Sequence, residues 1–101
     1  MLFADVITLI PENSKPHGIF ENVKSMPRTV YCNVESIGYN EAYAAREAGL
    51  NPEYRVTLAD AVEYGGERIC ELRGNKYRIV RTYVNRQRIE LTVERVDQWA
   101  N

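Results

Sequence analysis

The sequence predicts a mainly β protein, a small antiparallel β-barrel of about six strands with one short α-helix and a long loop after the first strand. Several runs alternate between apolar and polar side chains, as strands with one buried face do. Glycine-containing turns separate these runs closely in the second half of the chain, and one segment changes to helical spacing. A closed barrel is favoured because it leaves no strand edge exposed. Residues 1–101 are expected to form a single domain.

The first strand is predicted at residues 5–10, where valine, isoleucine and threonine dominate and Pro11 follows. Residues 11–27 then form a loop of about seventeen residues with no regular period, and loops of this length are usually functional or disordered. Apolar side chains such as Phe20 and Met26 lie within it. We expect them either to pack on the core or to contact a partner.

Residues 28–37 are predicted to form a long strand, because alternate residues from Val30 to Val34 are apolar. A helix is predicted at residues 39–48, since tyrosine, alanine and glutamate recur there at helical spacing. Gly49 supplies the residue of positive φ that commonly ends a helix. The helix is short and would be marginal alone in water, so its tyrosine and alanine stripe is expected to pack on another surface.

The second half of the chain is predicted to hold four further strands, at residues 54–59, 67–73, 76–84 and 89–96. Gly74 and Asn75 are the signal for a two-residue hairpin turn, because both tolerate positive φ. Residues 97–101 are expected to form a tail.

The strand at residues 76–84 mixes arginines with aliphatic and aromatic residues. Strict alternation places four side chains on one face, Tyr77, Ile79, Arg81 and Tyr83. The opposite face then carries Arg78, Val80, Thr82 and Val84. Both faces would combine apolar and charged side chains, which suits a strand that a neighbouring subunit covers.

The formal net charge is −1, so the molecule as a whole is neither a basic nucleic-acid binder nor an acidic tail protein. The charge is uneven, however, because the stretch from Arg68 to Arg88 holds seven basic residues and one acidic residue, Glu71. This local positive patch is interpreted either as a solvated hairpin face or as a contact surface.

Cys32 and Cys70 are the only cysteines, and each falls at an apolar position of a strand-like run. Both are predicted to be buried free thiols, because a disulfide framework or a zinc site needs more ligands at closer spacing. The apolar N-terminus is too short for a membrane span and lacks the basic leader of a signal peptide. We therefore expect a soluble protein made in a reducing cytoplasm.

The residues offer no argument for an enzyme. His17 is the sole histidine, and its place in a polar loop indicates a surface residue rather than a base or a metal ligand. Carboxylates are spread among arginines, so cross-strand ion pairs with Arg78, Arg88 and Arg95 explain them without catalysis. No catalytic residue, metal or cofactor is predicted.

A nucleic-acid-binding protein is the main alternative. Seven tyrosines, a basic hairpin and a small barrel are compatible with an oligonucleotide-binding β-barrel. Such proteins place aromatic and basic residues on one exposed strand face, whereas here both faces of the basic strand are mixed.

The sequence also resembles a known family. The resemblance is carried by "DVITLI", by "RTVYCNVESIGYNEAYAAREAGLNPEYRVTL" and by "YGGERICELRGNKYRIVRTY", in this order and spacing. Together they resemble the head–tail adaptor family, the head-closure or stopper proteins of long-tailed bacteriophages and prophages. Residues 11–27 and the tail depart from the family's pattern.

This resemblance implies a non-catalytic structural protein of the virion, assembled in the bacterial host cytoplasm. Such proteins form a homo-oligomeric ring of about twelve subunits, or about six in some related systems, and can be monomers in isolation. The ring lies beneath the portal and its adaptor ring, closes the DNA channel after packaging, and provides the attachment surface for the tail. The expected partners are therefore copies of the chain, portal or adaptor proteins, a tail protein and packaged DNA, without a membrane.

Two sets of candidate site residues follow from this resemblance. The first belongs to a loop that would reach the channel or a neighbouring ring: Lys15, His17, Phe20, Lys24 and Met26. The second would form contacts between subunits, with basic hairpin residues meeting acidic residues of the next copy: Arg78, Arg81, Tyr83, Arg86, Glu41, Glu47 and Glu53. For Arg81, an ion pair within one subunit with Glu90 or Glu94 is an equal alternative.

Overall fold

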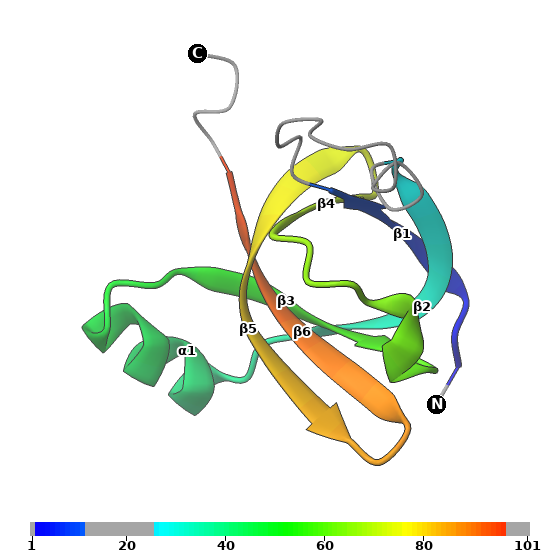
Figure 1. Cartoon of the computed structure of the whole chain (residues 1–101). Helices are drawn as coiled ribbons and strands as arrows, with labels where there is room; N and C mark the ends of the chain where they lie inside the picture. The colour runs from blue at the N-terminus through cyan, green and yellow to red at the C-terminus, as the bar shows by residue number, and fades with distance from the viewer. Residues whose placement is uncertain (1, 12–25, 97–101) are drawn as a thin grey trace.

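The computed structural model describes residues 2–11 and 26–96. It is a closed barrel of six antiparallel strands in the order β1-β2-β3-β6-β5-β4, with one α-helix outside the barrel (Figure 1). This confirms the predicted fold class. The elements are β1 (Asp5–Ile10), β2 (Arg28–Ser36), α1 (Tyr39–Glu47), β3 (Pro52–Leu58), the 3₁₀ helix η2 (Ala61–Glu63), β4 (Ile69–Leu72), β5 (Asn75–Asn85) and β6 (Arg88–Arg95).

The core fills the inside of the barrel with the alternate residues that the sequence pattern predicted. Every strand contributes fully or almost fully buried side chains to it, including Ile7, Leu9, Cys32, Val56, Leu58, Cys70, Leu72, Tyr77, Leu91 and Val93. The ring of Tyr54 meets that of Tyr77 edge to face, with centroids 5.9 Å apart. These apolar contacts between strands far apart in sequence stabilise the closed barrel.

The strand β5 does not alternate strictly, and here the prediction was wrong. Ile79 pairs with Val93, but Arg81 rather than Val80 pairs with Thr92, so Val80 is the extra residue of a β-bulge. The bulge reverses the two faces of the strand beyond it. Tyr77 and Ile79 point into the barrel, whereas Arg81 and Tyr83 pair with outward-facing residues of β6 and lie on the outer surface.

The hairpin turn between β4 and β5 also lies one residue earlier than predicted. Leu72 pairs with Asn75, so the two turn residues are Arg73 and Gly74, and their φ angles are +54° and +82°. Two residues of positive φ are what a type I′ turn requires, and its twist suits a tight hairpin. Arginine at the first of these positions adopts a conformation that side chains with a Cβ rarely take.

The helix α1 ends as predicted, but its tyrosines do not pack on the barrel. Gly49 has a φ of +88°, and backbone N–H groups of Gly49 and Leu50 donate to the carbonyls of Arg46 and Ala45. These two bonds form a Schellman motif. Ala45 is the buried residue of the helix, while Tyr39 and Tyr43 are 79% and 58% exposed. The helix therefore contacts β3 (Figure 1), with the small side chain of Ala45 buried and both tyrosines exposed to solvent.

Candidate interaction surfaces

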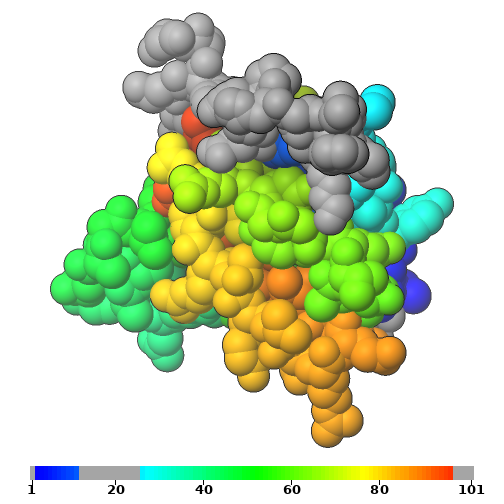
Figure 2. All heavy atoms as spheres, in the orientation of Figure 1, coloured from blue at the N-terminus to red at the C-terminus, as the bar shows by residue number. Residues whose placement is uncertain are grey.

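The β5–β6 hairpin projects beyond the barrel. All side chains of residues 81–88 are exposed, among them Tyr83 at 59% and Val84 at 57%. Figures 1 and 2 show the hairpin as a lobe at the bottom of the molecule, separate from the α1 lobe on the left. A strand pair that extends past its core presents side chains on both faces, so this hairpin is a candidate contact surface.

The outer face of the hairpin tip combines positive charge with aromatic surface. Arg81 and Tyr83 lie there, opposite Thr92 and Glu90 of β6. Within residues 2–11 and 26–96, neither Arg81 nor Arg86 forms an ion pair. Their charges are therefore available to an anionic partner, although water and salt screen them strongly in the free protein.

The alternative of an internal ion pair for Arg81 was wrong for both proposed partners. Glu94 is engaged by Arg78, with Nη1 and Oε2 3.2 Å apart. Glu90 faces the Nε atom of Arg55 at 3.8 Å. Arg78 was predicted to form either a subunit contact or a cross-strand pair, and the structure places it in the cross-strand pair.

The acidic residues expected to receive the hairpin are mostly engaged within the subunit. Glu41 of α1 bonds directly to Arg55 of β3, and this contact tethers the helix to the barrel. Glu53 lies 3.5 Å from Arg95, whose guanidinium also stacks over Tyr77 at 5.7 Å from the ring centroid. Only Glu47 of the three is exposed without an ion pair to any described residue.

Arg55 is surrounded by carboxylates on the outer face of β2, β3 and β6. Besides Glu41, it faces Glu35 at 3.7 Å and Glu90 at 3.8 Å. One cation among three carboxylates leaves this face with a negative balance. In oligonucleotide-binding barrels, strands 2 and 3 carry the binding face, and this face needs positive charge to attract the phosphates. The surface around Arg55 is negative instead.

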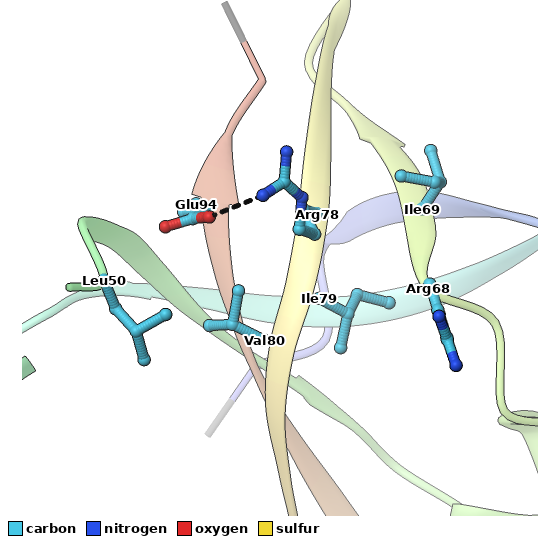
Figure 3. A pocket seen from close by; sticks show the side chains of 7 residues that line it. All are labelled: Leu50, Arg68, Ile69, Arg78, Ile79, Val80 and Glu94. Carbon is cyan, nitrogen blue, oxygen red and sulfur yellow. Dashed lines mark hydrogen bonds and ion pairs between the residues drawn. The ribbon is translucent and has the colours of Figure 1, made fainter. Parts of the chain in front are cut away.

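An apolar groove, which we call the outer groove, opens on the surface between Leu50, in the connection from α1 to β3, and residues of or beside the strands β4, β5 and β6 (Figure 3). Its volume is about 670 Å³, and it is lined by Leu50, Arg68, Ile69, Arg78, Ile79, Val80 and Glu94. The bulge residue Val80 faces it from one side and Leu50 from the other (Figure 3). A smaller hollow of about 410 Å³ lies beside the hairpin turn, where the Arg88 guanidinium sits 5.3 Å from the centroid of the Phe3 ring.

A rigid turn, which we call the Val62 knob, comprises residues 60–63 and includes η2. Asp60 Oδ1 accepts from the backbone N–H of Val62 at 3.1 Å, and the N–H of Ala61 donates to the carbonyl of Gln87 at 2.6 Å. The Arg28 Nη2 atom donates to the carbonyl of Glu63 at 2.8 Å. Despite this fixed backbone, Val62 is 81% exposed.

The connection that follows the knob is fixed by a buried carboxylate. Glu67 Oε2 lies 2.8 Å from Nη1 of Arg28, and its Oε1 accepts from the backbone N–H of Gly65 at 2.9 Å. The Tyr64 hydroxyl donates to the carbonyl of Glu67 at 2.6 Å, and burial, followed by the charge of Glu67, raises the pKa of Tyr64. Neither the knob nor the groove was predicted from the sequence.

Both cysteines are buried free thiols, as predicted. Burial raises the pKa of Cys32 to about 11, with a further increase from Asp5. Burial also raises the pKa of Cys70 to about 12, with a smaller contribution from Cys32. A thiol that stays protonated at neutral pH is a poor nucleophile and a poor metal ligand, so these residues are packing groups.

The predicted loop residues Lys15, His17, Phe20 and Lys24 lie outside the described residues. Met26 begins the second described segment and is 65% exposed. In the part of the chain that the structure describes, no three His, Cys, Asp or Glu residues are grouped so that they could hold a metal ion. No helix of that part is long and apolar enough to cross a membrane.

The surfaces that stand out are therefore the hairpin tip, the exposed side of α1, the outer groove and the Val62 knob. All four consist of connections between strands or of outward-facing side chains, because the strands pair with one another to close the barrel. A comparison with models of known protein families and with curated protein sequences gives no match for this chain.

Proposed function

We propose that the protein is a structural component of a bacteriophage or prophage virion that forms a ring in the head–tail connector. In this role the ring closes the DNA channel after packaging and offers the tail an attachment surface. The proposal begins from the resemblance of the sequence to the head-closure family. The geometric observation that carries it is the exposed β5–β6 hairpin tip, residues 81–88, which extends past the core and buries none of its side chains there.

The composition of this tip supports contact with a large partner rather than with a small molecule. Tyrosine and arginine are enriched at the centres of protein interfaces, because they combine large contact areas with directed hydrogen bonds. Arg81 and Arg86 have no ion pair with any described residue, and Tyr83 is exposed beside them. An acidic face of a neighbouring ring, or the phosphates of channel DNA, would complement these charges.

A second candidate is an oligonucleotide-binding barrel, and one observation favours it. Arg81 and Tyr83 share the outer face of the hairpin beyond the bulge, so a base could stack on the tyrosine while a phosphate meets the arginine. The carboxylates around Arg55 argue against binding on β2 and β3, so such binding would be confined to the hairpin.

Deletion of the gene from the phage or prophage that encodes it tests the connector role. We expect particles with packaged heads that lose DNA or lack tails, and restoration by the wild-type chain. The double variant Arg81→Glu/Arg86→Glu should fold normally but restore few infectious particles. Arg46→Glu is a matched control, because Arg46 is an exposed arginine on α1. Infectious particles produced normally without the protein would refute the proposal.

The oligonucleotide alternative is separated by salt dependence. A protein that meets DNA only through the arginines of the tip should bind a single-stranded oligonucleotide weakly and lose that binding steeply as salt rises. A dedicated binder should retain affinity through stacking and lose it in Tyr83→Ala. Fluorescence anisotropy of a labelled oligonucleotide measures both.

A further inference from the structure

We propose that the Val62 knob of one copy docks into the outer groove of a second copy. This head-to-tail contact would be the lateral joint between neighbouring subunits. The inference deepens the proposed ring function and depends on it for its biological setting, but the contact is a property of the chain itself and can be measured without a virion.

The groove has the chemistry of a receptor for one apolar side chain with acidic neighbours. Leu50, Ile69 and Val80 supply its apolar surface, and the outward-facing Arg68 and Arg78 stand beside them (Figure 3). Glu94 also lines the groove, but Arg78 pairs with it. Since Arg68 has no ion pair with a described residue, the groove carries a net positive charge.

The knob has the complementary chemistry. Val62 is 81% exposed, the largest exposed fraction among the large apolar residues that the structure describes. Asp60 precedes it and Glu63 follows it, so the apolar tip lies between two carboxylates. An apolar side chain flanked by acids fits an apolar groove flanked by arginines, and this charge match selects the occupant.

The knob is also rigid before it binds. Its backbone is held by the Asp60 side chain, by the carbonyl of Gln87 and by the Arg28 guanidinium. A contact residue that is already ordered loses little conformational entropy on association. These bonds hold a β-branched apolar residue in water, which contributes nothing to the core of a single copy.

One copy cannot fill its own groove with its own knob. The knob is bonded to Gln87 at one end of β6, and Glu94 lines the groove near the other end. The seven steps from Gln87 to Glu94 span about 23 Å of strand. Val62 is itself 81% exposed and does not line the groove of its own copy. Two different patches on one chain generate a heterologous contact, which builds a closed ring or an open filament according to the rotation between copies.

A mixing experiment tests this contact directly. Val62→Asp removes the knob and keeps the groove, whereas Val80→Asp spoils the groove and keeps the knob. Each variant alone should associate at least ~10-fold more weakly than the wild type, because each joint would bury a carboxylate in an apolar site. A mixture of the two has one intact joint per pair, so it should form a one-to-one dimer and nothing larger. Sedimentation velocity at several concentrations distinguishes monomer, dimer and higher species.

Val6→Asp is the matched control, since it places the same substitution at an exposed valine on β1, outside the knob, the groove and the hairpin tip. It should associate like the wild type. Circular dichroism verifies the fold of each variant, and Ile69→Asp replaces Val80→Asp if the latter unfolds. Wild-type association by Val62→Asp, or a mixture that contains no dimer, would overturn the inference.

Disulfide trapping decides the question if the wild-type contact is weak. The chain Val62→Cys/Ile69→Cys has one new thiol on each surface, and both natural cysteines are buried. On mild oxidation it should form a ladder of covalent oligomers faster than Val6→Cys/Ile69→Cys, whose second thiol lies on β1. Equal rates would refute the contact. If the ladder forms but deletion of the gene leaves the virions normal, the contact between copies is supported and the connector role is rejected. Failure of this contact can therefore be distinguished from failure of the proposed function.

Discussion

Replacing Arg28 by methionine should destabilise the protein far more than neutralising its partner Glu67. The two side chains are not equivalent, because 31% of the arginine side chain is exposed but only 4% of the glutamate side chain. Arg28 Nη1 lies 2.8 Å from Glu67 Oε2, and Arg28 Nη2 donates to the carbonyl of Glu63. Arg28→Met therefore leaves a buried carboxylate whose remaining bond is the one from the Gly65 N–H.

The magnitude follows from this asymmetry. Removing one partner of a buried ion pair costs about 3–5 kcal/mol, because the remaining charge is desolvated without compensation. Glu67→Gln keeps an oxygen that can accept from Gly65 and leaves Arg28 half-solvated, so it should lose only about 1–2 kcal/mol of charge-assisted bonding. Small domains unfold with about 5–15 kcal/mol in total, so Arg28→Met should remove a large fraction of the stability.

Urea denaturation followed by far-UV circular dichroism measures both changes as shifts of the midpoint at constant slope. Arg73→Met is the control, because both side chains of its pair with Asp5 are well exposed, at 49% and 36%, and the pair should contribute about 0–1 kcal/mol. If Glu67→Gln destabilises as much as Arg28→Met, the reasoning from a stranded charge is wrong. If Arg28→Met costs no more than Arg73→Met, the buried pair contributes no more than an exposed one.

Three further outcomes are expected. Arg86 has a φ of +63°, which is strained for a residue with a Cβ, so Arg86→Gly should leave the urea midpoint unchanged or raise stability by up to about 1 kcal/mol. A clearly lower urea midpoint would show that the backbone at Arg86 is not strained. Between about pH 9 and 11 the thiols of Cys32 and Cys70 ionise mainly in the unfolded chain, since their folded pKa values are about 11 and about 12. The free energy of unfolding should then fall with rising pH by up to about 1.4 kcal/mol per pH unit for each thiol. Urea titrations at several pH values should show a smaller fall of this free energy with pH in a Cys32→Ala/Cys70→Ala variant. Ala45→Lys should release α1 and speed its amide hydrogen exchange, whereas Ala44→Lys on the exposed side should not, and equal protection in both would show that the Ala45 contact is unimportant.

Most of the barrel was predictable, because a closed antiparallel sheet leaves its pattern in the sequence. The buried residues of β2 and β3, such as Cys32 and Val56, alternate with outward-facing ones as the period of a strand requires. Gly49 ended the helix where a residue of positive φ was needed. These features depend on local geometry and on one buried face, so each segment contains the information to predict them.

The bulge in β5 was missed because register belongs to a pair of strands and not to one. A trace of it is nevertheless visible in the sequence. The apolar residues of β5 change from odd positions at Tyr77 and Ile79 to an even position at Val84, whereas Ile89, Leu91 and Val93 of β6 keep their parity. A change of parity within one strand opposite a regular partner predicts an extra residue between the two parts.

The candidate surfaces were less predictable for a different reason. Charge and composition identified the basic hairpin, but the partners of each carboxylate depend on tertiary contacts, as Glu41 and Glu53 show by pairing with Arg55 and Arg95. The helix period likewise did not reveal that Ala45, and not the tyrosines, faces the barrel. The Val62 knob arises from bonds to distant residues and has no local signature.

Closure of the barrel limits how this protein can associate. An open sheet can add a strand from a partner along its whole edge, but here each of the six strands pairs with two neighbours, and the described part of β5 beyond the bulge pairs with β6 alone. Association must then use mainly side chains, and exposed apolar ones lie on the β5–β6 hairpin, on α1 and around η2. Among the described residues, these elements differ from one another in charge and shape. A surface composed of unlike patches favours heterologous contacts, the kind from which rings are built.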